Sequence, residues 1–185
     1  PKTPWGQYTA GYGHHSNAGW RGTKADIFEG GHRVPFLVRW PAKVKGGRVS
    51  DALIELTDVF TTVAEITGAK TGNDSSGMDS VSFLPLLSGL GTGTRTFAVH
   101  HSLHGIFALR QGDWKLIEGR RSGGFTQPRD GKQFTDNLPG QLYHLSHDLR
   151  EQTNVWAAEP ERVSAMRAFL REIQAKRGPE EPSVD

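Results

Sequence analysis

The stretch from Gly19 to Pro35 constrains the fold of this 185-residue chain more than any other part of it. It places three cationic side chains among glycines, and directly after it the chain becomes apolar. Gly30 and Gly31 allow the backbone to turn sharply, and the flexible ammonium of Lys24 can be held at the edge of a site. The pattern predicts a loop that faces an anion and leads into a strand.

The rest of the first half predicts one strand and one helix. Residues 34–40 are apolar on both faces, as in a strand buried between layers of helices. From 58 to 67, apolar residues recur at helical spacing, with Thr57 as the expected cap and Gly68 as the stop. A glycine-rich linker at 88–94 separates this half from a second unit.

The second half predicts short strands followed by one long helix. The expected strands cover residues 96–100, 106–110, 114–118 and 141–144. Residues 111–113 read as a tight hairpin turn between the second and third strands. The helix expected at 160–176 carries an apolar stripe that would pack on this small antiparallel sheet.

Motifs in a fixed order along nearly the whole chain resemble the sulfatase family of the alkaline phosphatase superfamily. They are R-G-x-K at 21–24, E-G-G-x-R-V-P at 29–35, W-P at 40–41, a D-x-F-x-T helix at 58–62, D-G-x-S-L-L-P-L-L at 79–87, an R-x-G-x-W-K-L-I hairpin at 110–117, and L-Y-D-L-x-x-D-P-x-E-x-x-N at 142–154. The chain departs from the family pattern at His144, Leu149 and Ser80, which replace an acid, a proline and a glycine.

The resemblance implies an α/β protein that is the C-terminal part of an alkaline phosphatase-like sulfatase fold. Residues 1–90 would be the C-terminal edge of the α/β domain, with the active-site loop, a strand and a helix. Residues 91–185 would be a small antiparallel β subdomain packed by the C-terminal helix.

Sulfatases of this kind use a formylglycine, made from the cysteine or serine of a C/S-x-P-S-R motif, and a calcium ion held by acidic residues. This chain has 0 cysteines, no such motif, no paired aspartates and no D-N-G triplet, and Pro1 is an improbable natural start. We therefore expect a C-terminal fragment of a longer enzyme. Formylglycine and calcium would belong to the full-length parent, with no metal ligand or cofactor within this chain, and the fragment alone would be inactive.

Lys24 is the one residue to which we assign a catalytic role. A lysine on a loop is ordinarily a solvated surface residue, but the match at R-G-x-K implies that this one contacts the sulfate. Sulfuryl transfer spreads negative charge over several oxygens, and a preorganised ammonium in a dry pocket stabilises that charge.

Five further residues are candidates for binding the substrate. His14 and His15 precede the lysine, at a position where family loops often contact the substrate, and Arg21 opens the R-G-x-K motif. His101 and His104 follow the first strand of the second unit, whose loop commonly reaches over the active-site mouth in this family. Each could instead be a solvated or structural side chain.

The histidine clusters also raise the possibility of a zinc site. His100 and His104 have the i, i+4 spacing, which brings two ligands together only on a helix. Gly105 and the flanking strand pattern argue against a helix here.

We expect the parent enzyme to hydrolyse sulfate esters, with sugars as the preferred class because the polar loop rich in histidine and tryptophan suits a hydroxylated ring. One alternative is a phosphodiester or phosphonate monoester hydrolase of the same superfamily. Another is a non-catalytic domain that binds carbohydrate or zinc. The substrate, the position of the sulfate and the type of nucleophile stay open.

The charge and hydropathy of the chain limit the kinds of partner that it can have. The formal net charge is only +2, from nearly balanced charges, and no apolar run approaches the roughly 20 residues of a membrane span. We therefore expect no nucleic acid and no membrane as partners. The expected partners are a sulfated small molecule or carbohydrate and the missing N-terminal part of the same enzyme. The compartment is unknown from the residues, and only the resemblance suggests a periplasmic, secreted or lysosomal location.

Overall fold

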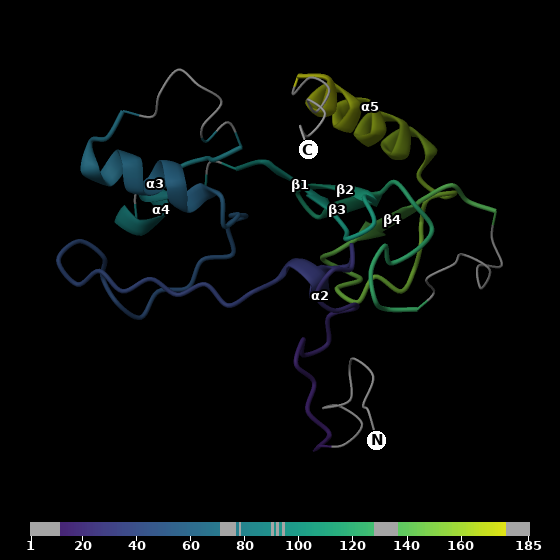
Figure 1. Ribbon diagram of the computed structural model, residues 1–185, viewed down its shortest axis with the longest axis horizontal. Coiled ribbons are helices and arrows are strands. Elements are labelled where there is room, and N and C mark those ends of the chain that lie inside the picture. The colour runs from purple at the N-terminus through teal and green to yellow at the C-terminus, as the bar shows by residue number, and fades with distance from the viewer. Residues whose placement is uncertain are drawn as a thin grey trace, which may run out of the picture. The chain divides into compact units, whose positions relative to one another are not determined.

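The computed structural model describes residues 12–70, 77, 79–89, 91, 93, 95–127 and 137–176 (Figure 1). The chain divides into two compact units, one made of Pro1–Val34 with Val99–Asp185 and the other of Pro35–Ala98. The predicted domains, 1–90 and 91–185, stay a prediction, but the compact units group the first 34 residues with the second half. Contacts between these two stretches include an ion pair between Glu29 and Lys115 at 3.0 Å and the packing of Ile27 and Phe28 on the sheet.

A four-stranded sheet forms the centre of the first unit (Figure 1). Its strands, in spatial order, are β1 (Phe97–His101), β2 (Phe107–Gln111), β3 (Trp114–Ile117) and β4 (Gln141–His144). The pairs β2–β3 and β3–β4 are antiparallel, so Leu116 lies opposite Leu109 on one side and Leu142 on the other. Gly112 adopts a φ of 58° in the turn between β2 and β3. The predicted strands and hairpin turn are confirmed to within a residue or two.

The core of this unit joins the sheet to the segment before it. Ile27 and Phe28 are fully buried against Ala108, Ile117 and Tyr143. The segment that carries Lys24 is therefore fixed to the sheet by apolar packing, where each fully buried large side chain contributes roughly 1.5–3 kcal/mol.

The long helix α5 (Pro160–Lys176) has the predicted bounds and contacts β3 (Figure 1). Its buried residues are Val163, Met166, Leu170 and Ile173. Their spacing of three or four places them on one face, so the predicted packing of the stripe is confirmed.

The paired glycines have a different role from the one predicted. They lie in the short helix α2 (Glu29–His32), and neither has a positive φ. A Cβ on Gly30 would lie 2.6 Å from the carbonyl oxygen of Arg21, and one on Gly31 would overlap the carbonyl oxygen of Asp26. The chain does turn here, in one turn of helix, but glycine is needed because the backbone passes too close for any side chain and not because of a positive φ.

The second unit contains the helices α3 (Asp58–Thr67) and α4 (Leu84–Ser88). The predicted helix at 58–67 is confirmed, as is its end at Gly68, which has a φ of 69°. Thr57 makes no capping hydrogen bond with its side chain. Asp58 instead accepts a hydrogen bond from the backbone N–H of Glu55 at 2.8 Å.

The strand predicted at residues 34–40 is not formed. The segment has no regular structure, and 40% of Phe36, 88% of Leu37 and 43% of Val38 is exposed. A strand forms only where another strand pairs with its backbone, and no described residue pairs with this segment. Apolar side chains of α3 are exposed as well, namely Val59, Phe60, Val63 and Ile66.

Across the described ranges, no helix has both the length and the apolar character that crossing a membrane requires.

Candidate functional site

Lys24 lies in a turn that a buried carboxylate holds. Asp26 is fully buried, and its side chain accepts hydrogen bonds from the backbone N–H groups of Thr23 at 2.7 Å and Thr126 at 3.0 Å. The N–H of Asp26 donates back to the carbonyl of Thr23 at 3.0 Å. Ala25, next in the turn, has a φ of 80°. The backbone is thus fixed from both sides while Lys24 itself is exposed.

The loop after β1 runs beside this turn. The N–H of Leu103 donates to the carbonyl of Ala25 at 3.0 Å, and that of His104 donates to Gly123 at 2.9 Å. His104 and His101 are both exposed, with the Nδ1 of His101 lying 3.0 Å from its neighbour's carbonyl oxygen. The structure therefore brings the turn of Lys24 and the loop of His104 together.

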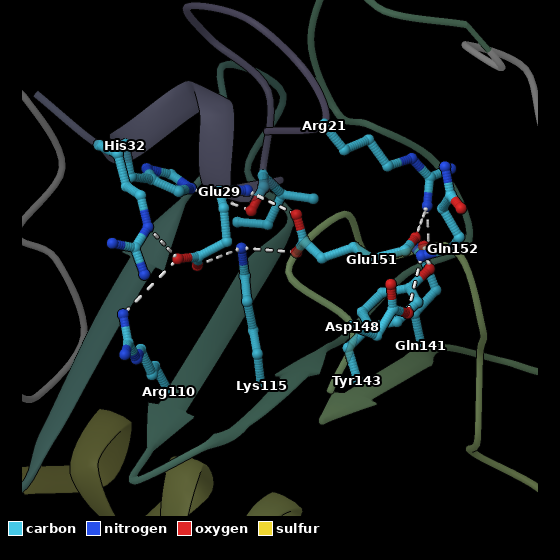
Figure 2. A network of polar contacts seen from close by, with 12 residues as sticks. Arg21, Glu29, His32, Arg110, Lys115, Gln141, Tyr143, Asp148, Glu151 and Gln152 are labelled. Atoms are coloured by element: carbon cyan, nitrogen blue, oxygen red, sulfur yellow. Dashed lines mark hydrogen bonds and ion pairs between the residues drawn. The ribbon is translucent and has the colours of Figure 1, made fainter. Parts of the chain in front are cut away.

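A buried ion-pair centre anchors α2 to the sheet (Figure 2). The centre consists of Lys115, which is 0% exposed on β3, with Glu29 at 3.0 Å and Glu151 at 2.9 Å. The backbone N–H of Glu29 also donates to the carboxylate of Glu151 at 2.7 Å. Arg33 at 2.8 Å and Arg110 at 3.5 Å supply further positive charge to Glu29.

The pKa values of the two carboxylates of the centre are shifted in opposite directions. Burial alone would raise the pKa of Glu29, but Lys115 and Arg33 outweigh it and lower this pKa to about 2. At Glu151 burial prevails over Lys115 and raises the pKa. Glu151 also has a φ of 53°, a left-handed conformation that non-glycine residues adopt at a cost. The contacts of its side chain and carbonyl offset that cost.

Two histidine rings stack beside this centre. His32 and His100 have ring centroids 4.2 Å apart and planes 20° apart. Burial and the nearby charge of Lys115 lower the pKa of His32 to about 4, and burial and His32 lower that of His100 to about 3. Both rings are therefore neutral at neutral pH, and the Nε2–H of His32 donates to the carbonyl of Ile27 at 3.0 Å.

Arg21 faces the inside of the protein (Figure 2). Its guanidinium donates to the hydroxyl of Tyr143 at 3.1 Å and to the carbonyl of Glu151, and it lies 3.8 Å over the ring of Phe28. The hydroxyl of Tyr143 donates in turn to Gln141 at 2.7 Å. Arg21 thus links the loop before Lys24 to the segment after β4.

An open cavity of about 850 Å³ lies next to Arg21. Two segments line it, the loop before Lys24 and the segment after β4, with His15, Gly19, Trp20, Arg21, Arg150 and Gln152. The side-chain amide of Asn17 fixes the loop by donating to Gly22 at 2.7 Å, and the guanidinium of Arg33 lies 3.9 Å over the ring of Trp20.

The structure thus divides the predicted site residues into two groups. His15 and Arg21 line the cavity, whereas Lys24, His101 and His104 lie on exposed positions of the turn and the loop beside it. His14 is exposed and does not line the cavity. Their predicted roles stay predictions.

Two residues that line the cavity, Arg150 and Gln152, were not predicted from the sequence. In the motif L-Y-D-L-x-x-D-P-x-E-x-x-N both occupy variable positions, so the resemblance assigned them no role. In the sequence they stand out only as the neighbours of the motif residue Glu151. Their position at the cavity follows from the fold, which brings Arg150 against Gly19 in the loop of Trp20.

The described residues do not fit a calcium or zinc ion. No three His, Cys, Asp or Glu side chains among them are grouped to hold a metal. Glu29, Glu151, Asp26 and Asp58 are each buried and held by cations or backbone N–H groups. The chain has no cysteine, and the expectation that formylglycine and calcium belong to the full-length parent stays a prediction.

Comparison with known proteins gives a consistent result. A family model described as "N-sulphoglucosamine sulphohydrolase, C-terminal" matches residues 17–177. The chain is 32% identical to an N-acetylgalactosamine-6-O-sulfatase of Bacteroides thetaiotaomicron over 89% of its length, and 29% identical to a Ulvan-active sulfatase of Formosa agariphila over 77%. It spans about a third of the length of these relatives, 32% in each case.

Solved structures show the same fold. One, from work on glycosaminoglycan metabolism by Bacteroides thetaiotaomicron, superposes with a TM-score of 0.73 at 30% identity, covering 88% of this chain and 33% of the other. A sulfatase from Pseudoalteromonas superposes with a TM-score of 0.71 at 22% identity, covering 90% of this chain and 34% of the other. The predicted fold class is confirmed.

Proposed function

This chain belongs to the sulfatase family, in the part that the C-terminal family model describes, and on that premise we propose that the protein hydrolyses sulfate esters of sugars, with Lys24 binding the sulfate. The observation that carries the proposal is the turn at residues 23–26. The buried carboxylate of Asp26 fixes it, and Lys24 is exposed from it.

A fixed backbone beneath a cationic side chain is what anion stabilisation requires. The ion-pair centre of Glu29, Lys115 and Glu151 and the core residues Ile27 and Phe28 hold the segment that follows the turn. The fixed backbone limits the positions that the ammonium of Lys24 can reach, and in the assembled site this ammonium stabilises the charge that grows on the sulfuryl oxygens.

The nucleophile and the metal must come from elsewhere. In the sulfatase family a formylglycine supplies the nucleophile and calcium supplies positive charge. We assign both to a further part of the full-length protein, comparable to the two thirds of each relative that this chain does not match.

Sugars are the favoured class of substrate. The relatives are named for N-acetylgalactosamine 6-O-sulfate and ulvan, and the cavity beside the loop combines an indole ring with polar side chains. These relatives are named as sulfatases, which favours sulfate over phosphate esters.

The test is the release of sulfate from N-acetylgalactosamine 6-sulfate by the full-length protein, with a phosphate monoester and a phosphodiester as competing substrates. Lys24→Ala should lower kcat/KM by at least 30-fold, which corresponds to about 2 kcal/mol of transition-state stabilisation. Lys45→Ala, at an exposed lysine of the second unit, is the matched control and should retain the full rate. Equal rates for the Lys24 variant and its control would remove Lys24 from the site. If the protein hydrolyses the phosphate esters faster than the sulfate ester, the proposed sulfatase reaction is wrong and the protein is a phosphate ester hydrolase.

A further inference from the structure

The cavity of about 850 Å³ holds an arginine for which the proposed reaction has no use. Arg150 is exposed, and its guanidinium lies against Gly19, where an added Cβ would be 3.2 Å from Nε. The side chain therefore crosses from the segment after β4 to the backbone of the loop that precedes Lys24. Its cationic end is placed on the cavity wall.

The acids near Arg150 in sequence are engaged elsewhere. Asp148 accepts hydrogen bonds from the backbone N–H groups of Gln152 and Thr153, both at 2.8 Å, and Glu151 pairs with Lys115 (Figure 2). Within the described ranges of the chain, Arg150 forms no ion pair with a carboxylate.

The rest of the cavity lining is also without acidic side chains. Among the described residues, the guanidinium of Arg21 donates to two neutral oxygens, the hydroxyl of Tyr143 and the carbonyl of Glu151. Arg21 thus lines the cavity with its guanidinium held by Tyr143 and Glu151, and Arg150 lines it together with His15 and Trp20 without a carboxylate partner among the described residues.

We propose that this cavity is a subsite for a second acidic group of the substrate, a carboxylate or sulfate on the sugar residue next to the one that is desulfated. Arg150 binds that group through the paired N–H donors that make guanidinium a good partner for planar anions. Trp20 offers an apolar edge to the ring, and Gln152 offers hydrogen bonds to hydroxyls. The volume lies within the range of about 300–1,000 Å³ that is usual for ligand cavities.

This inference rests on the proposed function, because it names the substrate of the same enzyme as an acidic, sulfated oligosaccharide. A neutral sulfated sugar would still be a substrate, but a poorer one. The preference for an acidic neighbour is the quantity to measure.

Three probes separate the possibilities: N-acetylgalactosamine 6-sulfate linked to glucuronate, linked to a sulfated neutral hexose, and linked to the same hexose without sulfate. The wild-type protein should prefer both acidic disaccharides over the neutral one, and the larger preference identifies carboxylate or sulfate as the better ligand. Arg150→Ala should lower this preference, as a ratio of kcat/KM values, at least 10-fold, mainly through KM. Arg150→Lys should restore part of it.

Arg171→Ala removes the same charge from an exposed position on α5 and should leave the preference unchanged. A wild-type protein without preference, or an Arg150→Ala variant that keeps it, would overturn the subsite while the sulfatase reaction stands.

Failure of the reaction itself has a different signature. If the wild-type protein releases no sulfate from any probe, the proposed function fails, and calorimetric titration with the unsulfated glucuronate disaccharide then decides the subsite. If the wild-type protein binds this disaccharide and Arg150→Ala weakens the binding, the proposed subsite is supported. If the wild-type protein does not bind it, the proposed subsite is wrong.

Discussion

Each compact unit of this protein contains a buried cluster of charge, and the two clusters have different surroundings. Lys115 lies between Glu29 and Glu151 next to fully buried side chains such as Ile117 and Phe28. In residues 35–98, the cluster joins a cation that is 7% exposed to two acids, and the apolar residues of the neighbouring α3 remain partly exposed.

The acids and cation of the second cluster are Glu55, Asp58 and Arg95. Burial by itself would raise the pKa of Asp58, but the hydrogen bonds from Arg95 and from backbone N–H groups lower it. The carboxylate of Asp58 also receives the N–H of Val81 at 2.9 Å, so one side chain joins three separate segments. Ion pairs thus lie beside fully buried apolar side chains in the first unit, whereas in the second they lie beside a helix whose apolar side chains are partly exposed.

The largest effect is expected from Lys115→Ala. Removing this ammonium leaves the buried carboxylate of Glu151 without a cation, while Glu29 keeps Arg33 and Arg110. Breaking a buried ion pair in this way typically costs about 3–5 kcal/mol. Thermal unfolding of the full-length protein should show the loss. Lys176→Ala, which breaks an exposed pair with Glu172 whose side chains are 72% and 58% exposed, should cost less than about 0.5 kcal/mol. Equal losses for the two variants would contradict the role of the centre.

A smaller and local effect is expected from Arg95→Ala. Asp58 would retain its backbone donors from Glu55 and Val81, so we expect a loss of about 2 kcal/mol rather than the full cost of a bare buried charge. Hydrogen exchange should rise at the amides of α3 and not at those of β3. If protection of β3 falls as much, the two units are not separate in stability.

The smallest effect is a loss of folding stability on acidification, and we expect it in the first unit, where His32 and His100 lie. The pKa values of His32 and His100 are lowered to about 4 and about 3, so below pH 6.5 the unfolded chain binds protons that the folded chain does not. Stability is thus fully present above pH 6.5 and is lost as the pH falls toward these values. Between pH 7 and pH 6 we expect a loss of about 1 kcal/mol.

Other groups near these rings modify the lower part of the profile. The lowered pKa of Glu29 adds a loss between pH 4.5 and about 2, and the raised pKa of Glu151 gives a gain in the opposite direction as the pH falls. Lys115, His101 and Arg110 complete the charged surroundings of the two rings. Thermal unfolding at pH 7 and pH 6 is the measurement, with His100→Gln as the comparison. An unchanged slope in this variant would assign the dependence to other groups.

Local patterns in the sequence were sufficient for much of the fold. The hairpin at Gly112, the end of α3 at Gly68 and the stripe of α5 each depend on residues within a few positions of one another. The ordered motifs identified the family, and the role that the motif R-G-x-K predicts for Lys24 stays a prediction.

Contacts between distant segments could not be read in this way. In the sequence, Lys115 is the lysine of a strand motif. Only folding places it between the carboxylates of Glu29 and Glu151, and Glu29 lies 86 positions before it in the chain. The same holds for Arg150 against Gly19, and for residues 34–40, which are apolar enough for a buried strand but have no described strand beside them. The sequence by itself determined the family, the strands of the sheet and the helices α3 and α5, because periodicity and turn chemistry act locally. It did not predict the short helices α2 and α4. Only the tertiary structure decided which charges are buried together and which cations face the cavity, because these depend on which segments pack against each other.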